Sequence, residues 1–259
     1  MNRLILIEGL PGTGKTTLAK WLSDGLTDKG IENLLLLEGD ERVPCDFYET
    51  AGIPSAQFED LCASNPEISK ELHAIARKTE NYYYLRIDKS PEIAKPLLRP
   101  YDIGDGSNAS ITVNDYIPCA LERLQDWVSQ NPTGGKTVIM ESGYLQNPIN
   151  ELLFRHASDE EVRSFINSIT QILRPLSPVC IYLRRNTADE AINFAKMVKG
   201  SGWAERVDNL LKQTGCEDLF RRRFKLELEL LPQIKNLCCH VCGGNWDDVK
   251  RKINRFFSL

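Results

Sequence analysis

The sequence predicts an α/β fold in which a five-stranded parallel sheet carries helices on both faces. Five short apolar runs have the length of buried strands, and segments with helical periodicity separate them along the chain. This alternation favours parallel strands, because the crossover connections between such strands are right-handed. A chain of 259 residues is long enough to bury a core of this kind. We therefore expect residues 1–259 to form a single domain.

The first strand–helix–strand unit is predicted at the start of the chain. Residues 3–8 form an apolar run typical of a buried strand, and residues 34–37 form a second one. Between them, leucines recur every four residues over residues 15–29, which predicts a helix that ends at Gly30.

Residues 42–132 have a different character and are interpreted as a helical insertion between the second and third strands. Prolines are frequent there, and aromatic and acidic residues are mixed. Helical patterns cover residues 68–85 and 116–128, whereas residues 96–110 are predicted to form an ordered loop.

The strand pattern resumes after this insertion. Apolar runs at residues 137–141, 178–183 and 237–242 predict the third, fourth and fifth strands. Helices are predicted over residues 160–173, from residue 187 onward, and after residue 245. Thr187 and Glu190 have the spacing of a capping box, and Asn245 is placed to cap the last helix.

Composition and charge restrict the partners. The chain is 42% apolar and 26% charged with a net charge of -4, so we expect no nucleic-acid partner. No apolar stretch has the length of a membrane helix, and the opening apolar run is too short for a secretory signal. The eight cysteines are interpreted as free thiols in a reducing compartment. We expect a cytoplasmic protein without a membrane partner.

A phosphate-binding loop is the strongest signal in the sequence. The pattern Gly-x-x-x-x-Gly-Lys-[Ser/Thr] is matched at every fixed position between residues 9 and 16. Its backbone amides and the positive end of the following helix suit an anionic phosphate. A chance glycine-rich turn is the alternative, but this segment follows a predicted strand and opens a predicted helix. The expected nucleotide-binding residues are Pro11, Gly12, Thr13, Gly14, Lys15, Thr16 and Thr17.

The loop residues predict a nucleoside triphosphate, with ATP favoured, together with Mg²⁺. Lys15 is placed to bridge the outer phosphates, and the Thr16 hydroxyl is placed to bind magnesium. The sequence has no Asn-Lys-x-Asp motif for reading guanine, which tilts the choice from GTP toward ATP.

With this loop at the start of the chain, carboxylates at two strand ends and a long insertion, the sequence resembles the P-loop nucleoside/nucleotide kinase-like family. The resemblance covers the layout of nearly the whole chain, although only the loop is specific. It implies a three-layer P-loop NTPase fold, with the phosphate acceptor held by the insertion. It also implies a lid at residues 191–215 and a base-side loop at residues 243–245.

Carboxylates at the predicted strand ends are the candidate catalytic groups. Asp40 follows the second strand and is the preferred base for an acceptor hydroxyl, with Glu38 and Asp46 as reserves. Glu141 ends the third strand, where a carboxylate would hold Mg²⁺. In deoxynucleoside kinases, which this strand end resembles, the acid is followed by arginine and serine. Here Ser142 follows Glu141 directly and the arginine is missing. A solvated turn and a structural carboxylate are the alternatives.

Basic residues after the fourth strand are the candidates for neutralising the transferred phosphoryl group. Arg184 is the first choice and Arg185 follows it. The lid offers Lys196, Lys199 and Arg206 in place of arginines, and a solvated helix face is the alternative for each. Residues 221–223, three consecutive arginines, are interpreted as such a face.

Two further clusters have competing interpretations. Arg77, Tyr82, Tyr83, Tyr84 and Arg86 lie on a predicted helix and could line an acceptor pocket, with core packing as the alternative. The cysteines and histidine of residues 238–242 suggest a metal, but no second Cys-x-x-Cys occurs, so a buried strand is favoured.

The sequence thus predicts an ATP-dependent kinase in which Lys15, Asp40, Glu141 and Arg184 act on an unidentified small-molecule acceptor. A nucleotide-dependent switch or ATPase, which would use the insertion to bind a partner, is the alternative. A nucleotide sugar or an antibiotic is as compatible with the sequence as a nucleoside acceptor. The oligomeric state is not predicted.

Overall fold

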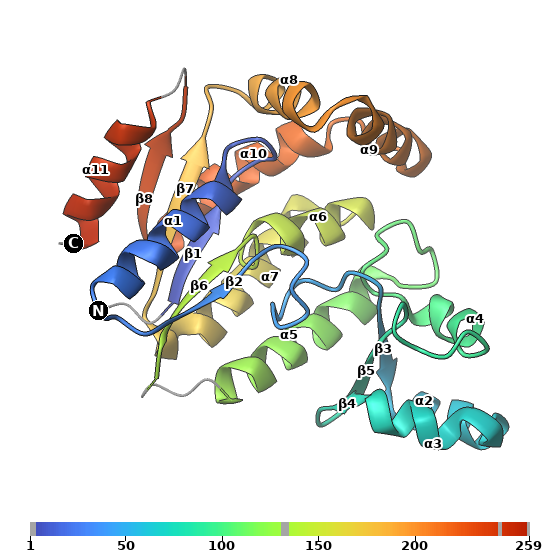
Figure 1. Cartoon of the computed structure of the whole chain (residues 1–259). Coiled ribbons are helices and arrows are strands. Elements are labelled where there is room, and N and C mark those ends of the chain that lie inside the picture. Colours follow the sequence, from blue (N-terminus) through green and yellow to red (C-terminus); the bar gives the residue numbers. More distant parts are fainter. Residues whose placement is uncertain (1–3, 131–134, 243–244, 258–259) are drawn as a thin grey trace.

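The computed structural model describes residues 4–130, 135–242 and 245–257 (Figure 1). Its centre is a five-stranded parallel sheet in the order β2-β6-β1-β7-β8. The strands are β1 (Leu4–Glu8), β2 (Asn33–Leu36), β6 (Thr137–Glu141), β7 (Pro178–Arg184) and β8 (Lys235–His240). All five strands predicted from the sequence are therefore confirmed, and no end is shifted by more than two residues.

Helices cover both faces of this sheet, as the sequence predicts. One face packs against α1 (Lys15–Asp28) and α11 (Trp246–Phe257). The other packs against α5 (Val113–Gln130), α6 (Gln146–Phe154), α7 (Asp159–Leu173) and α10 (Leu219–Leu230) (Figure 1). Side chains alternate along β1, so that Ile5 and Ile7 enter the first core and Leu4 and Leu6 the second. The result is a three-layer α/β arrangement.

The helix predicted from residue 187 is the first half of a helical hairpin. It consists of α8 (Ala188–Lys199) and α9 (Ser201–Thr214), and we call this pair the α8–α9 hairpin. The Thr187 hydroxyl accepts a hydrogen bond from the Glu190 amide at 3.1 Å, as expected for a cap. The reciprocal half of the capping box does not form, because the Glu190 carboxylate accepts from the Asn186 amide instead.

The insertion departs from the prediction because it is only partly helical. It contains a three-stranded antiparallel sheet of β3 (Thr50–Pro54), β5 (Tyr82–Arg86) and β4 (Arg77–Lys78). Its helices are α2 (Ser55–Ser64), α3 (Pro66–Ile75) and the short α4 (Lys95–Leu98). The helix predicted over residues 68–85 ends at Ile75, because the aromatic run that follows pairs with β3.

The small sheet and α2–α4 have a core of their own. Tyr83 stacks on Phe58 of α2 with ring centroids 4.0 Å apart, and Ile53 and Leu85 pack beside them. In contrast, α5 joins the main core, where Tyr116 contacts Phe165 of α7 edge to face. The segment between β2 and β6 therefore combines a separate substructure with one helix of the main three-layer fold.

In the described parts of the chain, no helix has both the length and the apolar character that a membrane span requires. All eight cysteines are unpaired thiols.

Candidate active site

The glycine-rich loop fits tightly between β1, β7 and α8. Gly9 has a φ of 138°, and a Cβ atom there would lie 2.1 Å from the carbonyl oxygen of Leu183. Gly12 has a φ of 78°, and its Cβ would lie 2.9 Å from Ala195 of α8. Both positions combine a left-handed backbone with no room for a side chain, so only glycine fits without strain.

Beyond this loop, three side chains predicted for the site lie together. The Thr16 hydroxyl donates a hydrogen bond to Oε1 of Glu141 at 2.7 Å. Lys15 is only 6% exposed, and its Nζ lies 3.4 Å from the carbonyl oxygen of Leu10. The sheet order explains this meeting, because β6 pairs directly with β1 and Glu141 lies opposite Ile7. The carboxyl end of β6 therefore reaches the start of α1.

Burial disfavours the charged forms of Glu141 and Lys15. Burial raises the pKa of Glu141 above its ordinary value, against the Thr16 hydrogen bond and the charge of Lys15. Burial also lowers the pKa of Lys15, against the charges of Glu38 and Glu141. In addition, Oε2 of Glu141 is buried and has no hydrogen-bond partner among the described residues. Such an atom is free to bind a cation or a water molecule.

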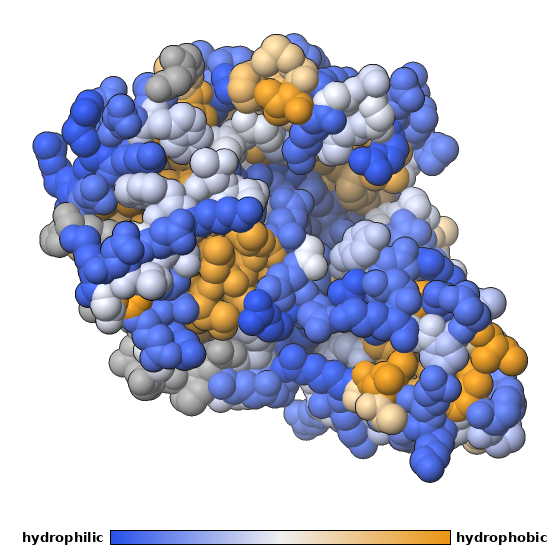
Figure 2. Space-filling model, in the orientation of Figure 1, coloured by the Kyte–Doolittle hydropathy of each residue, from blue (hydrophilic) through white to orange (hydrophobic). Residues whose placement is uncertain are grey.

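A cavity of about 710 Å³ connects the loop with the α8–α9 hairpin. Figure 2 shows the hollow between this hairpin and α6, with both hydrophilic and hydrophobic atoms in its interior. Residues of the loop, Glu38 and Glu141 form one part of its wall. Other elements add polar groups to the wall: Gln146 and Asn150 from α6, Arg185 from the residue after β7, and Arg223 from α10.

Arg223 is a buried cation that the sequence analysis missed. The sequence predicts a solvated face for residues 221–223, but the Arg223 side chain is 0% exposed. Its Nε lies 3.0 Å from Oε1 of Glu227, also 0% exposed, and its Nη1 donates to Oδ1 of Asn150 at 2.8 Å. Its Nη2 has no partner among the described residues. The correction follows from helix geometry, because three consecutive arginines point to different faces and only the third faces the core.

Glu8 positions the start of α6 and was also missed. It is fully buried and accepts hydrogen bonds from the backbone amides of Tyr144 at 2.7 Å and Gln146 at 3.0 Å. Burial raises the pKa of Glu8 to about 7, against these two hydrogen bonds. Oε1 of Gln146 is itself buried without a partner among the described residues. A carboxylate that ends the first buried strand was the available signal.

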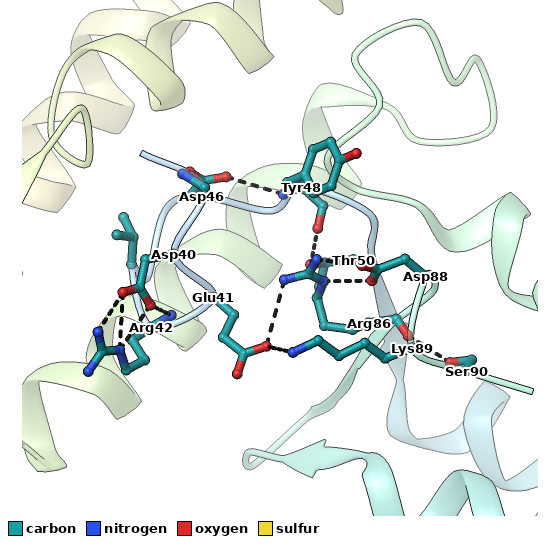
Figure 3. A network of polar contacts seen from close by, with 12 residues as sticks. Asp40, Glu41, Arg42, Asp46, Tyr48, Thr50, Arg86, Asp88, Lys89 and Ser90 are labelled. Carbon is teal, nitrogen blue, oxygen red and sulfur yellow. Dashed lines mark hydrogen bonds and ion pairs between the residues drawn. The ribbon is translucent and has the colours of Figure 1, made fainter. Parts of the chain in front are cut away.

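Asp40 lies outside the cavity, so its expected role as the base is not supported. Its carboxylate is held by Arg42, with Nε at 2.9 Å from Oδ1 and Nη2 at 2.6 Å from Oδ2 (Figure 3). The Arg42 hydrogen bond lowers the pKa of Asp40. Of the two reserves, Glu38 lines the cavity and receives a long hydrogen bond of 3.4 Å from Ser142. Asp46 lines a smaller cavity of about 210 Å³ that shares Glu38.

Arg184 does not line the cavity, whereas its neighbour Arg185 does. Arg184 is the last residue of β7 and pairs with His240 of β8. The Arg185 guanidinium lies 3.7 Å from the ring centroid of Phe194 in α8 and 3.4 Å from Glu190. The reason is the alternation of side chains along an extended chain, which reverses the direction from one residue to the next.

The lysines of the α8–α9 hairpin divide in the same way. Lys196 forms an ion pair with Asp208 at 2.7 Å, whereas Lys199 lines the cavity above the ring of Trp203. Arg206 is exposed on α9 and does not reach the cavity.

The aromatic and basic residues of the insertion lie on strands, and three of them line a separate cavity. This cavity of about 540 Å³ includes Arg77, Tyr84 and Arg86 and shares no residue with the cavity at the loop. Figure 3 shows Arg86 between Asp88 and Glu41. Because strand residues alternate, Tyr83 faces the core of the insertion, while Tyr84 donates a hydrogen bond to a backbone carbonyl of α5.

The predicted base-side loop is only partly described. Residues 243 and 244 lie outside the described residues, while Asn245 and Trp246 line the cavity at the loop. Asn245 directly precedes α11, and its backbone carbonyl accepts from the Asp248 amide at 3.1 Å, but its side chain bonds residues before the helix. It accepts from the Cys242 amide at 3.2 Å and donates to the His240 carbonyl at 3.0 Å.

Across residues 4–130, 135–242 and 245–257, no group of three or more histidine, cysteine, aspartate or glutamate residues is placed to hold a metal ion. The paired Thr16 and Glu141 side chains are oxygen donors of the kind that Mg²⁺ takes alongside nucleotide phosphates. A comparison of the sequence with protein-family models and with curated proteins found no match.

Proposed function

We propose that the chain is an ATP-dependent kinase of the P-loop nucleoside/nucleotide kinase-like type, which transfers the γ-phosphate to a small molecule. The observation that carries this proposal is the Thr16–Glu141 hydrogen bond of 2.7 Å beside buried Lys15, at the mouth of a glycine-rich loop. Hydroxyl, carboxylate and ammonium at the start of a helix are the groups that a magnesium–triphosphate complex needs.

In this proposal the loop amides and Lys15 bind the β- and γ-phosphates. The phosphate charge would offset the burial that lowers the pKa of Lys15. Thr16 and Oε2 of Glu141 would hold Mg²⁺, which neutralises charge on the phosphate oxygens. Arg223 replaces Arg184 as the expected partner of the transferred group, because its Nη2 is buried without a partner.

Transfer would form a bond between the acceptor oxygen and the γ-phosphorus. The bond from phosphorus to the β–γ bridging oxygen breaks, and its electron pair leaves with ADP. The hydroxyl proton passes to Glu38, the carboxylate on the cavity wall, and from there to solvent. Positioning and charge neutralisation supply most of the rate enhancement.

The cavity favours this reading over a nucleotide-dependent switch. A switch needs the loop and Glu141 but no concave space for an acceptor, whereas about 710 Å³ opens here beside the loop. The test is ATP consumption with Mg²⁺ against pools of nucleosides, nucleotides, sugars, aminoglycosides and aromatic alcohols. We expect one pool to accelerate ADP release and to carry the phosphate, and Lys15→Ala to abolish both. Slow turnover that ignores every pool would favour the switch.

A further inference from the structure

The end of the cavity farthest from the loop is apolar. Trp203, Val207 and Leu210 lie on α9 at intervals of four and three residues and therefore share one face of the helix. All three are half-buried and line the cavity. An apolar helix face normally packs into a solid core. Val207 also packs against the main core, but all three residues border the cavity. This face therefore has the character of a binding surface.

The opposite wall completes this apolar end. Phe154 of α6 and Leu219 and Phe220 of α10 line the same cavity. Figure 2 shows hydrophobic atoms inside the hollow beneath the α8–α9 hairpin. Aliphatic and aromatic side chains from three helices thus enclose a space suited to a ring-shaped, weakly polar body.

Lys199 is the charged residue at this end, where its Nζ lies 4.9 Å from the centroid of the Trp203 ring. Two buried polar groups occur where this end approaches the loop. Gln146 and Arg223 each present a buried polar atom without a partner among the described residues, Oε1 and Nη2 respectively. Both residues line the cavity. A buried polar atom without a partner costs free energy unless a ligand satisfies it. The occupant should therefore carry a polar end toward the loop and an apolar end toward α9.

The cavity also extends from the loop toward α11, where a nucleotide base could lie. Asn245 and Trp246, at the start of α11, line the cavity on the side of β8. In Figure 1, α11 and α9 lie at opposite ends of the molecule's upper half, with the loop between them. A nucleotide base directed toward Trp246 leaves the α9 end to a second molecule.

We propose that the acceptor is a hydroxyl compound with an apolar ring body that binds between α6, α9 and α10. This inference rests on the proposed kinase function and narrows its acceptor to an aromatic or alicyclic alcohol. The hydroxyl points toward Gln146 and Arg223, and the ring contacts Trp203, Val207 and Leu210.

The test uses 2-naphthol, a neutral fluorescent aromatic alcohol, titrated into the 259-residue chain with Mg²⁺ and a non-hydrolysable ATP analogue. We expect saturable binding to the wild type, weakened at least about tenfold by Val207→Asp, because the new carboxylate enters the apolar wall. Asn209→Asp is the matched control, since it adds the same charge to an exposed residue of the same helix. We expect that variant to bind like the wild type.

Binding of a fluorescent ADP is measured on the same three proteins and distinguishes the two claims. Absence of ADP binding by the wild type would overturn the proposed function. Intact ADP binding with no 2-naphthol binding, or with equal 2-naphthol binding by all three proteins, would overturn the acceptor assignment alone. A Val207→Asp protein that no longer binds ADP has lost the fold of the site, and Leu210→Asp then replaces it.

Discussion

The buried pair of Arg223 and Glu227 offers the sharpest separation of stability from function. Both side chains are 0% exposed, and Tyr182 donates a hydrogen bond of 2.6 Å to the second oxygen of Glu227. Arg223→Met would leave the Glu227 carboxylate buried without its cation. Loss of one partner of a buried ion pair costs about 3–5 kcal/mol. We expect the free energy of unfolding to fall by that amount in a urea titration.

The double variant Arg223→Met, Glu227→Gln removes both charges together. The glutamine carbonyl can still accept from Tyr182, so no buried charge and no orphaned hydroxyl remains. Replacing both members of a buried ion pair by uncharged residues often changes the free energy of unfolding little. We therefore expect the double variant to recover most of the stability that the single variant loses.

Activity should not recover with stability. If Nη2 of Arg223 contacts the transferred phosphoryl group, its loss should lower kcat by about 10²–10³, the usual effect of deleting one charge-stabilising donor. The kcat of ATP turnover by the folded double variant measures this loss directly. A stable double variant with the kcat of the wild type would show that Arg223 has only a structural role, and this part of the proposal would be refuted.

Three other variants test neighbouring parts of the structure. Thr16→Ala should raise the Mg²⁺ concentration needed for half-maximal turnover, while Thr16→Ser should not, because serine keeps the hydroxyl that bonds Glu141. Gly12→Ala should weaken nucleotide binding in a fluorescence titration, because its Cβ would meet Ala195; equal effects of Gly25→Ala, which meets nothing within 4 Å, would contradict this. Burial raises the pKa of Glu151 from 4.5 to about 7, so between these values the folded chain holds a proton that the unfolded chain has released. Stability from this group is therefore complete below 4.5 and declines toward pH 7, by at most about 1.4 kcal/mol per pH unit, and Glu151→Gln should remove that slope in urea titrations.

The main fold could be predicted from the sequence because its strands are buried on both faces. Such strands are continuous apolar runs, as in β1 and β6, and they stand out without any partner in view. The small sheet of the insertion could not be predicted in this way. Its central strand is the run Tyr82–Arg86, which has mixed character and becomes a strand through its pairing with β3.

The loop side of the site was predictable because its residues are contiguous in the sequence. Glu141 was also predictable, since it ends a recognisable strand. The rest depends on side-chain direction, which a one-residue shift reverses, as for Arg184 and Arg185. Arg223 lies in a run of three arginines, and only the packing of α10 shows which of them is buried.

The central claim is that the loop binds a magnesium–nucleoside triphosphate complex through Lys15. The most direct measurement is an isothermal calorimetric titration of a non-hydrolysable ATP analogue with Mg²⁺ into the wild type and Lys15→Ala. We predict one site per chain in the wild type and at least about a hundredfold weaker binding in the variant, because a buried ammonium beside the phosphates is lost. Equal affinities in the two proteins, or no binding by the folded wild type, would contradict the account.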